Sequence, residues 1–296
     1  MYNSGIKDTI FIKARAKINL NLQVLEKRQD NYHNIESIFQ KINIYDELFL
    51  SRNETNDLII NSNIKELENE DNIIYKAYVK LKEKYSQING ITVNLHKRIP
   101  MQAGMAGGST DCVAFIVATN RLYNLNMNME EFKIIGSSLG ADVVPCFYNM
   151  AVKANGIGDK IEKINTDFLY YILIVKPPFS FSTKEMYDEI DNNVKSRKSD
   201  FESLNNIVKA LKSSSIELLA NNLYNTFEEI VIDKIQDIKN ELVNNGAVGT
   251  LMTGSGSAIF GLFKSKDDIR QAYKNLNNKY EIYLTTSYNS YREEKL

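Results

Sequence analysis

Residues 100–111 read Pro100-Met-Gln-Ala-Gly-Met-Ala-Gly-Gly-Ser-Thr-Asp111, a glycine-rich loop followed by residues that favour the start of a helix. The largely apolar run 112–122 predicts the helix itself. A glycine loop that leads into a helix leaves backbone N–H groups unpaired, and the helix dipole favours an anion beside them. We therefore expect residues 103–110 to bind a phosphate group, with a plain tight turn as the alternative.

The loop differs from two common nucleotide-binding motifs. No Gly-Lys-Ser/Thr closes it, so it is not a P-loop. It also lacks the glycine spacing of the dinucleotide-binding motif, and no ribose-binding acid follows it.

Composition narrows the class of protein. The chain has 296 residues, with 36 Lys and Arg against 37 Asp and Glu, a balance that argues against a nucleic-acid binder. Its two cysteines, Cys112 and Cys146, are too few for a zinc site of four thiolates or a disulfide framework. The first residues lack the apolar segment of a signal peptide. We expect a cytoplasmic protein.

The hydrophobic pattern predicts strands and helices mixed along the whole chain. Residues 14–24 alternate between apolar and polar side chains, which predicts a strand with one buried face that carries Lys17 and Asn19 together on the other. The uncharged stretch 242–263 contains five glycines, so we expect a strand, a loop and a strand there rather than a membrane span. The other expected strands are 32–50, interrupted near 43–46, then 91–95 and 168–175; the other expected helices are 73–85, 129–139 and 183–190, the last followed by a charged loop over 191–200.

This mixture predicts an α+β fold rather than a doubly wound parallel sheet. The length suggests two domains or one large one. We expect a boundary near Asp167, which gives domains of residues 1–166 and 167–296.

Residues 100–111 resemble the central phosphate-binding motif of the GHMP kinases. Ala16-Lys-Ile-Asn-Leu20, followed by Asp30-Asn-Tyr-His33, is similar to the amino-terminal signature of one branch, the 4-diphosphocytidyl-2-C-methyl-D-erythritol kinases. Gly140-Ala-Asp-Val143 resembles the catalytic segment of that branch, and Met252-Thr-Gly-Ser-Gly256 resembles its carboxy-terminal glycine loop. The four motifs occur in the family's order and span most of the chain.

The resemblance implies a two-domain GHMP kinase fold, with an N-terminal ribosomal-S5-like α+β domain and a C-terminal ferredoxin-like α/β sandwich. It also implies an enzyme of the non-mevalonate route to isoprenoids that uses ATP and Mg²⁺ to phosphorylate the 2-hydroxyl of a small cytidine-bearing substrate, acts as a monomer or homodimer, and binds neither nucleic acid nor membrane.

Carried over to this chain, the resemblance makes Asp142 the general base and Lys17 its cationic neighbour. A substrate hydroxyl is a poor nucleophile until a base accepts its proton, and a lysine offsets charge on the transferring phosphoryl group. From the residues alone, the favoured interpretation of Lys17 is a solvated charge on the polar face of a strand, and Asp142 is as readily a helix-terminus or turn residue.

The remaining site residues are also implied by the resemblance. For the substrate, Asn19 would hydrogen-bond near the reacting hydroxyl, Tyr32 and His33 would hold the cytosine ring, and Thr183 and Tyr187 would close that pocket; alternatively, the last two are a helix cap and a helix core residue. Asn72 and Lys97 align with positions near the adenine. The ATP-binding loop comprises Pro100, Ala103, Gly104, Met105, Ala106, Gly107, Gly108, Ser109 and Thr110.

For Mg²⁺, Ser109 is the protein ligand that the resemblance favours, with helix capping as its alternative role. Asp111, in the first turn of the helix, would reach the metal through water.

Some positions depart from the family pattern. Asn31 stands where glycine is expected, Val144 precedes Pro145 where the proline is expected earlier, and Asn149-Met150 replaces a glycine pair. Two alternatives therefore stay open. One is another GHMP kinase that acts on homoserine, a sugar or mevalonate; the other is a weakly active paralogue that binds ATP.

Overall fold

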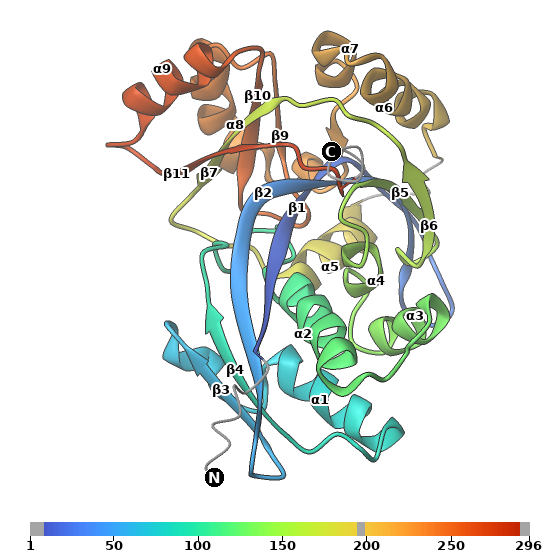
Figure 1. Ribbon diagram of the computed structural model, residues 1–296. Coiled ribbons are helices and arrows are strands. Elements are labelled where there is room, and N and C mark those ends of the chain that lie inside the picture. Colours follow the sequence, from blue (N-terminus) through green and yellow to red (C-terminus); the bar gives the residue numbers. More distant parts are fainter. Residues whose placement is uncertain (1–8, 194–198, 291–296) are drawn as a thin grey trace. The chain divides into compact units, whose positions relative to one another are not determined.

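The computed structural model describes residues 9–193 and 199–290 (Figure 1). Strands and helices are mixed along the chain, as the sequence predicted. The strands are β1 (Ile10–Lys27), β2 (His33–Asn53), β3 (Leu58–Ser62), β4 (Gly90–His96), β5 (Ala151–Asn155), β6 (Lys160–Ile164), β7 (Tyr171–Lys176), β8 (Tyr224–Asn225), β9 (Gly249–Met252), β10 (Ile259–Phe263) and β11 (Glu281–Thr286). The helices are α1 (Ile73–Lys84), α2 (Gly107–Tyr123), α3 (Met129–Ser137), α4 (Val143–Cys146), α5 (Thr183–Asn193), α6 (Phe201–Ser213), α7 (Ile216–Ala220), α8 (Glu228–Asn244) and α9 (Lys266–Leu276), with a 3₁₀ turn at Lys65–Leu67.

The chain divides into two compact units, and each is discontinuous in sequence. Among the described residues, the first unit holds 9–16, 44–99 and 106–147, and the second holds 17–43, 100–105, 148–193 and 199–290. The chain passes from one unit to the other within β1, within β2 and in the glycine loop, between Met105 and Ala106. A domain boundary after residue 166 stays a prediction.

In the first unit, helices pack on one face of the strands. The end of β2 pairs antiparallel with β4, from Glu47 opposite His96 to Asn53 opposite Gly90, and β4 pairs parallel with β3. Helix α1 buries Ile74, Ala77, Tyr78 and Leu81, whose spacing gives it one apolar face. These side chains, with those of α2 and of the strands, form one hydrophobic core.

The second unit contains a four-stranded antiparallel sheet in the order β11-β7-β10-β9. Apolar side chains of β7 and β10 form a core with those of α5, α8 and α9. The predicted strand, loop and strand are confirmed as β9, the glycine loop and β10, but the start of the segment 242–263 was wrong, because residues 242–244 end α8. Within residues 9–193 and 199–290, no helix combines the length and the apolar character needed to span a bilayer.

Strand β1 differs from the expectation of a single buried face. Both faces are buried from Ala16 to Val24, including the polar side chains of Lys17, Asn19, Asn21 and Gln23. These polar groups tolerate burial because they are hydrogen-bonded: Asn21 Nδ2 donates to Ser203 Oγ, and Gln23 Nε2 to the carbonyl of Asp200.

Several predicted boundaries were wrong. β2 runs through 43–46 without interruption, because the carboxylate of Asp46 is buried against hydrogen-bond donors and does not need solvent. α2 begins at Gly107, five residues before the predicted run. Residues 191–193 continue α5 instead of opening a charged loop, and 194–198 of that expected loop lie outside the described residues.

Candidate active site

The first half of the glycine loop belongs to the second unit and packs closely against the carboxy-terminal glycine loop of the same unit. Gly104 has a φ of 70°, and a Cβ at this position would lie 2.1 Å from the carbonyl oxygen of Thr253. The two glycine loops of the sequence, around 104 and around 254, are thus in backbone contact. Ala258 N donates to Ala103 O at 3.3 Å, and Thr253 Oγ1 donates to Gly104 O at the same distance. Gly104 fits here because it has no side chain and accepts a positive φ.

Strand β1 supports both loops. The backbone N–H of Lys17 donates to Met105 O at 3.2 Å. The side-chain oxygen of Asn19 accepts hydrogen bonds from Gly254 N at 3.0 Å and from Lys17 Nζ at 2.7 Å, while its Nδ2 donates to Ser37 Oγ at 2.8 Å. Asn19 therefore joins β1, β2 and the carboxy-terminal glycine loop; its contact with a substrate stays a prediction.

The second half of the loop forms the start of α2. Ala106, the residue before the helix, adopts a left-handed conformation with φ 55°, and no side chain caps the helix. The first-turn N–H groups at Gly107, Gly108 and Ser109 therefore point out of the helix without a capping side chain. Ser109 is half-buried and is not the N-cap, so its predicted capping role is not what the structure shows. Such an uncapped N-terminus suits an anion.

A buried ion-pair network lies behind this helix start. Lys97 Nζ donates to Asp46 Oδ2 at 2.5 Å and to Asp111 Oδ2 at 2.7 Å, and all three side chains are at most 5% exposed. The other oxygen of Asp46 accepts from the backbone N–H groups of Arg98 and Ile99. Lys97 Nζ lies 3.2 Å from the position that a Cβ on Gly107 would take. The ammonium group that was predicted near the adenine is thus engaged by two carboxylates.

Burial is the largest single influence on the pKa values of both Asp111 and Lys97 in this network. Burial raises the pKa of the Asp111 carboxyl well above its ordinary value; the ammonium of Lys97 opposes that rise, and the nearby Asp46 adds to it. Burial alone disfavours the charged form of Lys97, but Asp111 and Asp46 outweigh it and raise the pKa of its ammonium. Among the described residues, Asp111 Oδ1 has no hydrogen-bond partner.

The predicted catalytic pair consists of one buried and one half-buried residue. Lys17 is 2% exposed, which excludes the solvated charge that its strand position allowed, and its Nζ lies 5.1 Å from the centre of the Phe39 ring. Asp142 is half-buried and immediately precedes α4, which contains both Val144 and Pro145. Lys17 belongs to the second unit and Asp142 to the first, and their catalytic pairing stays a prediction.

Asn72 has a clear local role. Its side-chain oxygen accepts from Ile74 N at 3.0 Å, which caps α1, and its Nδ2 donates to Leu67 O at 2.8 Å. A role beside the adenine stays a prediction for this residue.

The residues predicted to hold a cytosine ring are partly assembled within the second unit. The ring of His33 stacks on that of Tyr187, with 5.0 Å between their centres, and Tyr187 meets Phe227 edge-on. Tyr32 is 57% exposed, and Asn31 before it takes the positive φ expected of a turn, 65°. Thr183 is the first residue of α5, and its hydroxyl lies 2.8 Å from that of Ser255 in the carboxy-terminal glycine loop.

Two charged residues of this cluster were missed from the sequence. Asp191 Oδ1 lies 2.7 Å from His33 Nε2, and Asp191 Oδ2 lies 2.5 Å from Lys27 Nζ. Asp191 follows Tyr187 by four residues, so both lie on one face of α5. That spacing is the signal in the sequence, whereas the charged run from residue 191 onward predicts a loop.

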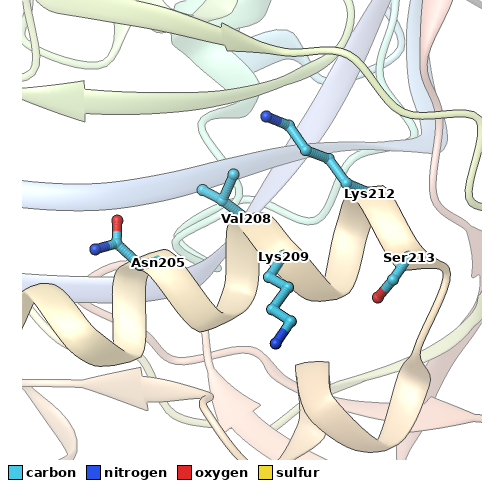
Figure 2. Close-up of a pocket in the computed structure, with 5 residues that line it drawn as sticks. All are labelled: Asn205, Val208, Lys209, Lys212 and Ser213. Carbon is cyan, nitrogen blue, oxygen red and sulfur yellow. The ribbon is translucent and has the colours of Figure 1, made fainter.

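One hollow of about 380 Å³ lies beside α6, away from all of these residues in the sequence (Figure 2). Lys209 and Lys212 project to different sides of the helix, so their ammonium groups do not converge on a common anion. The hollow contains none of the predicted site residues; its lining consists of Asn205, Val208, Lys209, Lys212 and Ser213.

Within the described residues, no group of three or more His, Cys, Asp or Glu side chains is placed to hold a metal ion.

Comparison with known proteins identifies relatives along nearly the whole chain. Residues 72–150 match the GHMP kinases N terminal domain, and residues 207–282 match the GHMP kinases C terminal domain. The 4-diphosphocytidyl-2-C-methyl-D-erythritol kinase of Clostridioides difficile is 39% identical over 95% of this chain and 96% of its own. The enzyme of the same name from Thermoanaerobacter pseudethanolicus is 41% identical over 92% of this chain and 94% of its own.

Solved structures share the fold. A crystal structure of 4-(cytidine 5'-diphospho)-2C-methyl-D-erythritol kinase superposes with a TM-score of 0.79 at 24% identity, covering 95% of this chain and all of that one. The homoserine kinase of Cytophaga hutchinsonii superposes with a TM-score of 0.73 at 18% identity, covering 97% of this chain and 96% of that one. The two-domain α+β fold predicted from the motifs is therefore confirmed.

Proposed function

The chain belongs to the GHMP kinase family of small-molecule kinases, and from that premise we propose that it transfers the terminal phosphoryl group of ATP to the 2-hydroxyl of 4-diphosphocytidyl-2-C-methyl-D-erythritol. The strongest support is the 39% identity, over almost the full length of both chains, to a relative named for that substrate. The product would serve the non-mevalonate route to isoprenoids.

The glycine loop fits the phosphates of ATP. Gly107 and Gly108 carry no Cβ that would keep a phosphate from the backbone, and the N-terminus of α2 has no capping side chain. When bound, Mg²⁺ would neutralise charge on the phosphates. The half-buried hydroxyl of Ser109 in the first turn is the protein oxygen best suited to reach such an ion, whereas Asp111 is buried and bound to Lys97.

Asp142 and Lys17 would perform the chemistry. As general base, Asp142 would accept the proton of the 2-hydroxyl while its oxygen attacks the phosphorus. The Lys17 ammonium would offset negative charge on the transferring group. Holding the two reacting oxygens in line contributes the rest of the rate, since phosphoryl transfer depends mainly on positioning and charge.

The second candidate is another GHMP kinase of the homoserine, sugar or mevalonate type. The His33–Tyr187 stack argues for the cytidyl substrate, because a flat ring system and a hydrogen-bonding imidazole suit a nucleobase. A weakly active ATP-binding paralogue remains the third. Location in the cytoplasm and a monomeric or homodimeric state stay predictions.

Release of ADP, coupled to a spectroscopic assay, tests the proposal. The purified chain is assayed with ATP, Mg²⁺ and, in parallel, the cytidyl substrate, homoserine, galactose or mevalonate. Turnover with the cytidyl compound and inhibition by CMP are expected. Turnover with another acceptor instead would favour the second candidate, and ATP binding with no ADP release on any acceptor would favour the third.

A further inference from the structure

Asp191 holds the one buried histidine of the proposed substrate site. His33 Nε2 lies 2.7 Å from Asp191 Oδ1, and the His33 side chain is 5% exposed. The second carboxylate oxygen accepts from Lys27 Nζ at 2.5 Å. All three residues belong to the second unit, so this arrangement is local to it.

The carboxylate fixes which nitrogen of His33 carries the proton. Its hydrogen bond to Lys27 comes first in lowering the pKa of Asp191, and its hydrogen bond to His33 lowers it further, against the opposing effect of burial. An ionised carboxylate only accepts hydrogen bonds, so Nε2 must donate. In the neutral form of an imidazole whose Nε2 carries the proton, Nδ1 presents a lone pair.

A second contact from the same helix fixes the plane of the ring. Tyr187, one turn before Asp191 on α5, stacks on His33 at 5.0 Å with 23° between the ring planes. Phe227 supports Tyr187 from the side. The stack with Tyr187 therefore fixes the plane of the imidazole, and the hydrogen bond to Asp191 fixes the directions in which its two nitrogens point.

We propose that Asp191 is a positioning residue for substrate recognition: it holds His33 in the Nε2–H form, so that Nδ1 accepts a hydrogen bond from the exocyclic amino group of a cytosine ring. This inference rests on the proposed function, in which His33 contacts the base, and adds the residue that orients this histidine. Uracil has a carbonyl at the corresponding position, which would face the Nδ1 lone pair acceptor to acceptor. A site with an unpaired buried polar group rejects the wrong ligand strongly.

The proton position can be observed without any assay of activity. The chain has two histidines, His33 and His96, and His96 is exposed on β4. In ¹⁵N NMR spectra at a pH where imidazoles are neutral, His33 is expected to show one protonated Nε2 and one unprotonated Nδ1, with His96→Gln assigning the signals. Protonation at Nδ1 in the neutral ring would overturn the proposal.

Substitutions then test whether Asp191 is the cause. Asp191→Ala is expected to give a mixture of the two neutral forms of His33. Asp188→Ala removes an exposed carboxylate three residues earlier on α5 and is expected to leave the spectrum as in the parent. If Asp191→Ala does not fold, Asp191→Asn is the substitute. Its side chain keeps the size of Asp191, but its amide can either donate to or accept from Nε2 of His33, so it no longer selects one form of the ring. A parent-like spectrum in Asp191→Asn and Asp191→Ala would overturn the proposal.

Kinetics test the consequence for recognition. In Asp191→Ala, the KM for the cytidyl substrate is expected to rise roughly 10-fold, with the KM for ATP unchanged and the preference for cytidyl over uridyl substrate reduced. A general loss of structure would instead change both KM values, and an unchanged cytidyl preference would refute the role. If the parent protein turns over no cytidyl substrate, the proposed function fails, while the NMR result still reports on the Asp191–His33 bond.

Discussion

Lys97 and Asp111 join the two ends of the glycine loop through one buried hydrogen bond of 2.7 Å. Lys97 comes just before the loop, and Asp111 lies in the helix that follows it. Asp46, on β2, binds the same ammonium and also the two backbone N–H groups after Lys97. The position of the loop therefore depends on three ionisable side chains that are buried from water.

Lys97→Met should destabilise the protein severely. It leaves Asp46 and Asp111 buried without their shared cation, and breaking a buried ion pair on one side costs about 3–5 kcal/mol. Urea unfolding at neutral pH measures the change in the free energy of unfolding. Lys264→Met is the control, because Lys264 pairs with Glu217 at the surface, where such a pair is worth less than about 1 kcal/mol. Equal effects of the two substitutions would contradict the buried network.

Asp111→Asn should change how stability depends on pH. The pKa of Asp111 is raised in the folded protein above its ordinary value of 3.8, whereas the unfolded chain titrates near that value. Between these pKa values the folded state holds a proton that the unfolded state has lost, so the contribution of Asp111 to stability falls as pH rises. The side-chain amide in the variant does not titrate, so this loss of stability with rising pH is absent from Asp111→Asn.

Relative to that of the parent, the free energy of unfolding of Asp111→Asn should therefore be larger at about pH 8 than at about pH 5, so the variant gains relative stability as pH rises. Asp46→Asn is the comparison: its carboxylate accepts from Lys97 and two backbone donors, and the amide replaces one acceptor with a donor. Asp46→Asn is expected to destabilise at both pH values. A relative stability of Asp111→Asn that declines with pH would show that Asp111 is ionised in the folded protein.

Gly104→Ala and Gly108→Ala should have opposite effects on folding. At Gly104 an added Cβ would collide with the carbonyl of Thr253 in a backbone of positive φ, whereas at Gly108 it would meet Ile73 at an ordinary 3.8 Å. Alanine inside a helix gains about 0.5–1 kcal/mol over glycine. Thermal unfolding should show a lower melting temperature for Gly104→Ala and an equal or higher one for Gly108→Ala.

Gly108→Ala should nevertheless bind ATP less well, because its methyl group separates the phosphate from the backbone of the first turn. The KM for ATP is the measurement, since folding is not impaired. An unchanged KM would place the phosphates elsewhere than at the N-terminus of α2.

Asp142→Asn should abolish most turnover and preserve ATP binding. Loss of a general base lowers the rate by about 10²–10⁴-fold. Single-turnover ADP release and equilibrium binding of ATP separate the two steps. Asp267→Asn, on the exposed face of α9 with a 94% exposed side chain, is the matched control. Activity near the parent level in Asp142→Asn would remove this residue from the chemistry.

Local features of the fold could be predicted from the sequence. The spacing of Ile74, Ala77, Tyr78 and Leu81 gave α1, and the broken apolar run around Gly254 gave the loop between β9 and β10. Ends of elements were less predictable. α2 begins at Gly107 because Ala106 takes a left-handed conformation, which nothing in the identity of an alanine indicates.

Long-range pairings could not be predicted in the same way. Asp46 looked like a break in β2 because its partner, Lys97, is 51 positions away. The hydrogen bond between Asn19 and Gly254, 235 positions later, could not be foreseen either, while the contact of Asn19 with a substrate stays a prediction. The motifs identified the family correctly, whereas the roles they imply for individual site residues stay predictions. The hydrogen bonds that hold each side chain required coordinates.

The interleaved order of the two units bears on how the chain is synthesised. A nascent chain that has emerged through Phe147 carries every segment of the first unit, yet also residues 17–43 and 100–105, whose partners in β8 and around Thr253 are not yet made. The edge of β1 at Asn21 and Leu22, which pair with Tyr224 and Asn225, would wait without a strand partner until the carboxy-terminal third of the protein leaves the ribosome. Fragments cut at the middle of the chain should accordingly aggregate, because each half lacks backbone partners that the other half supplies.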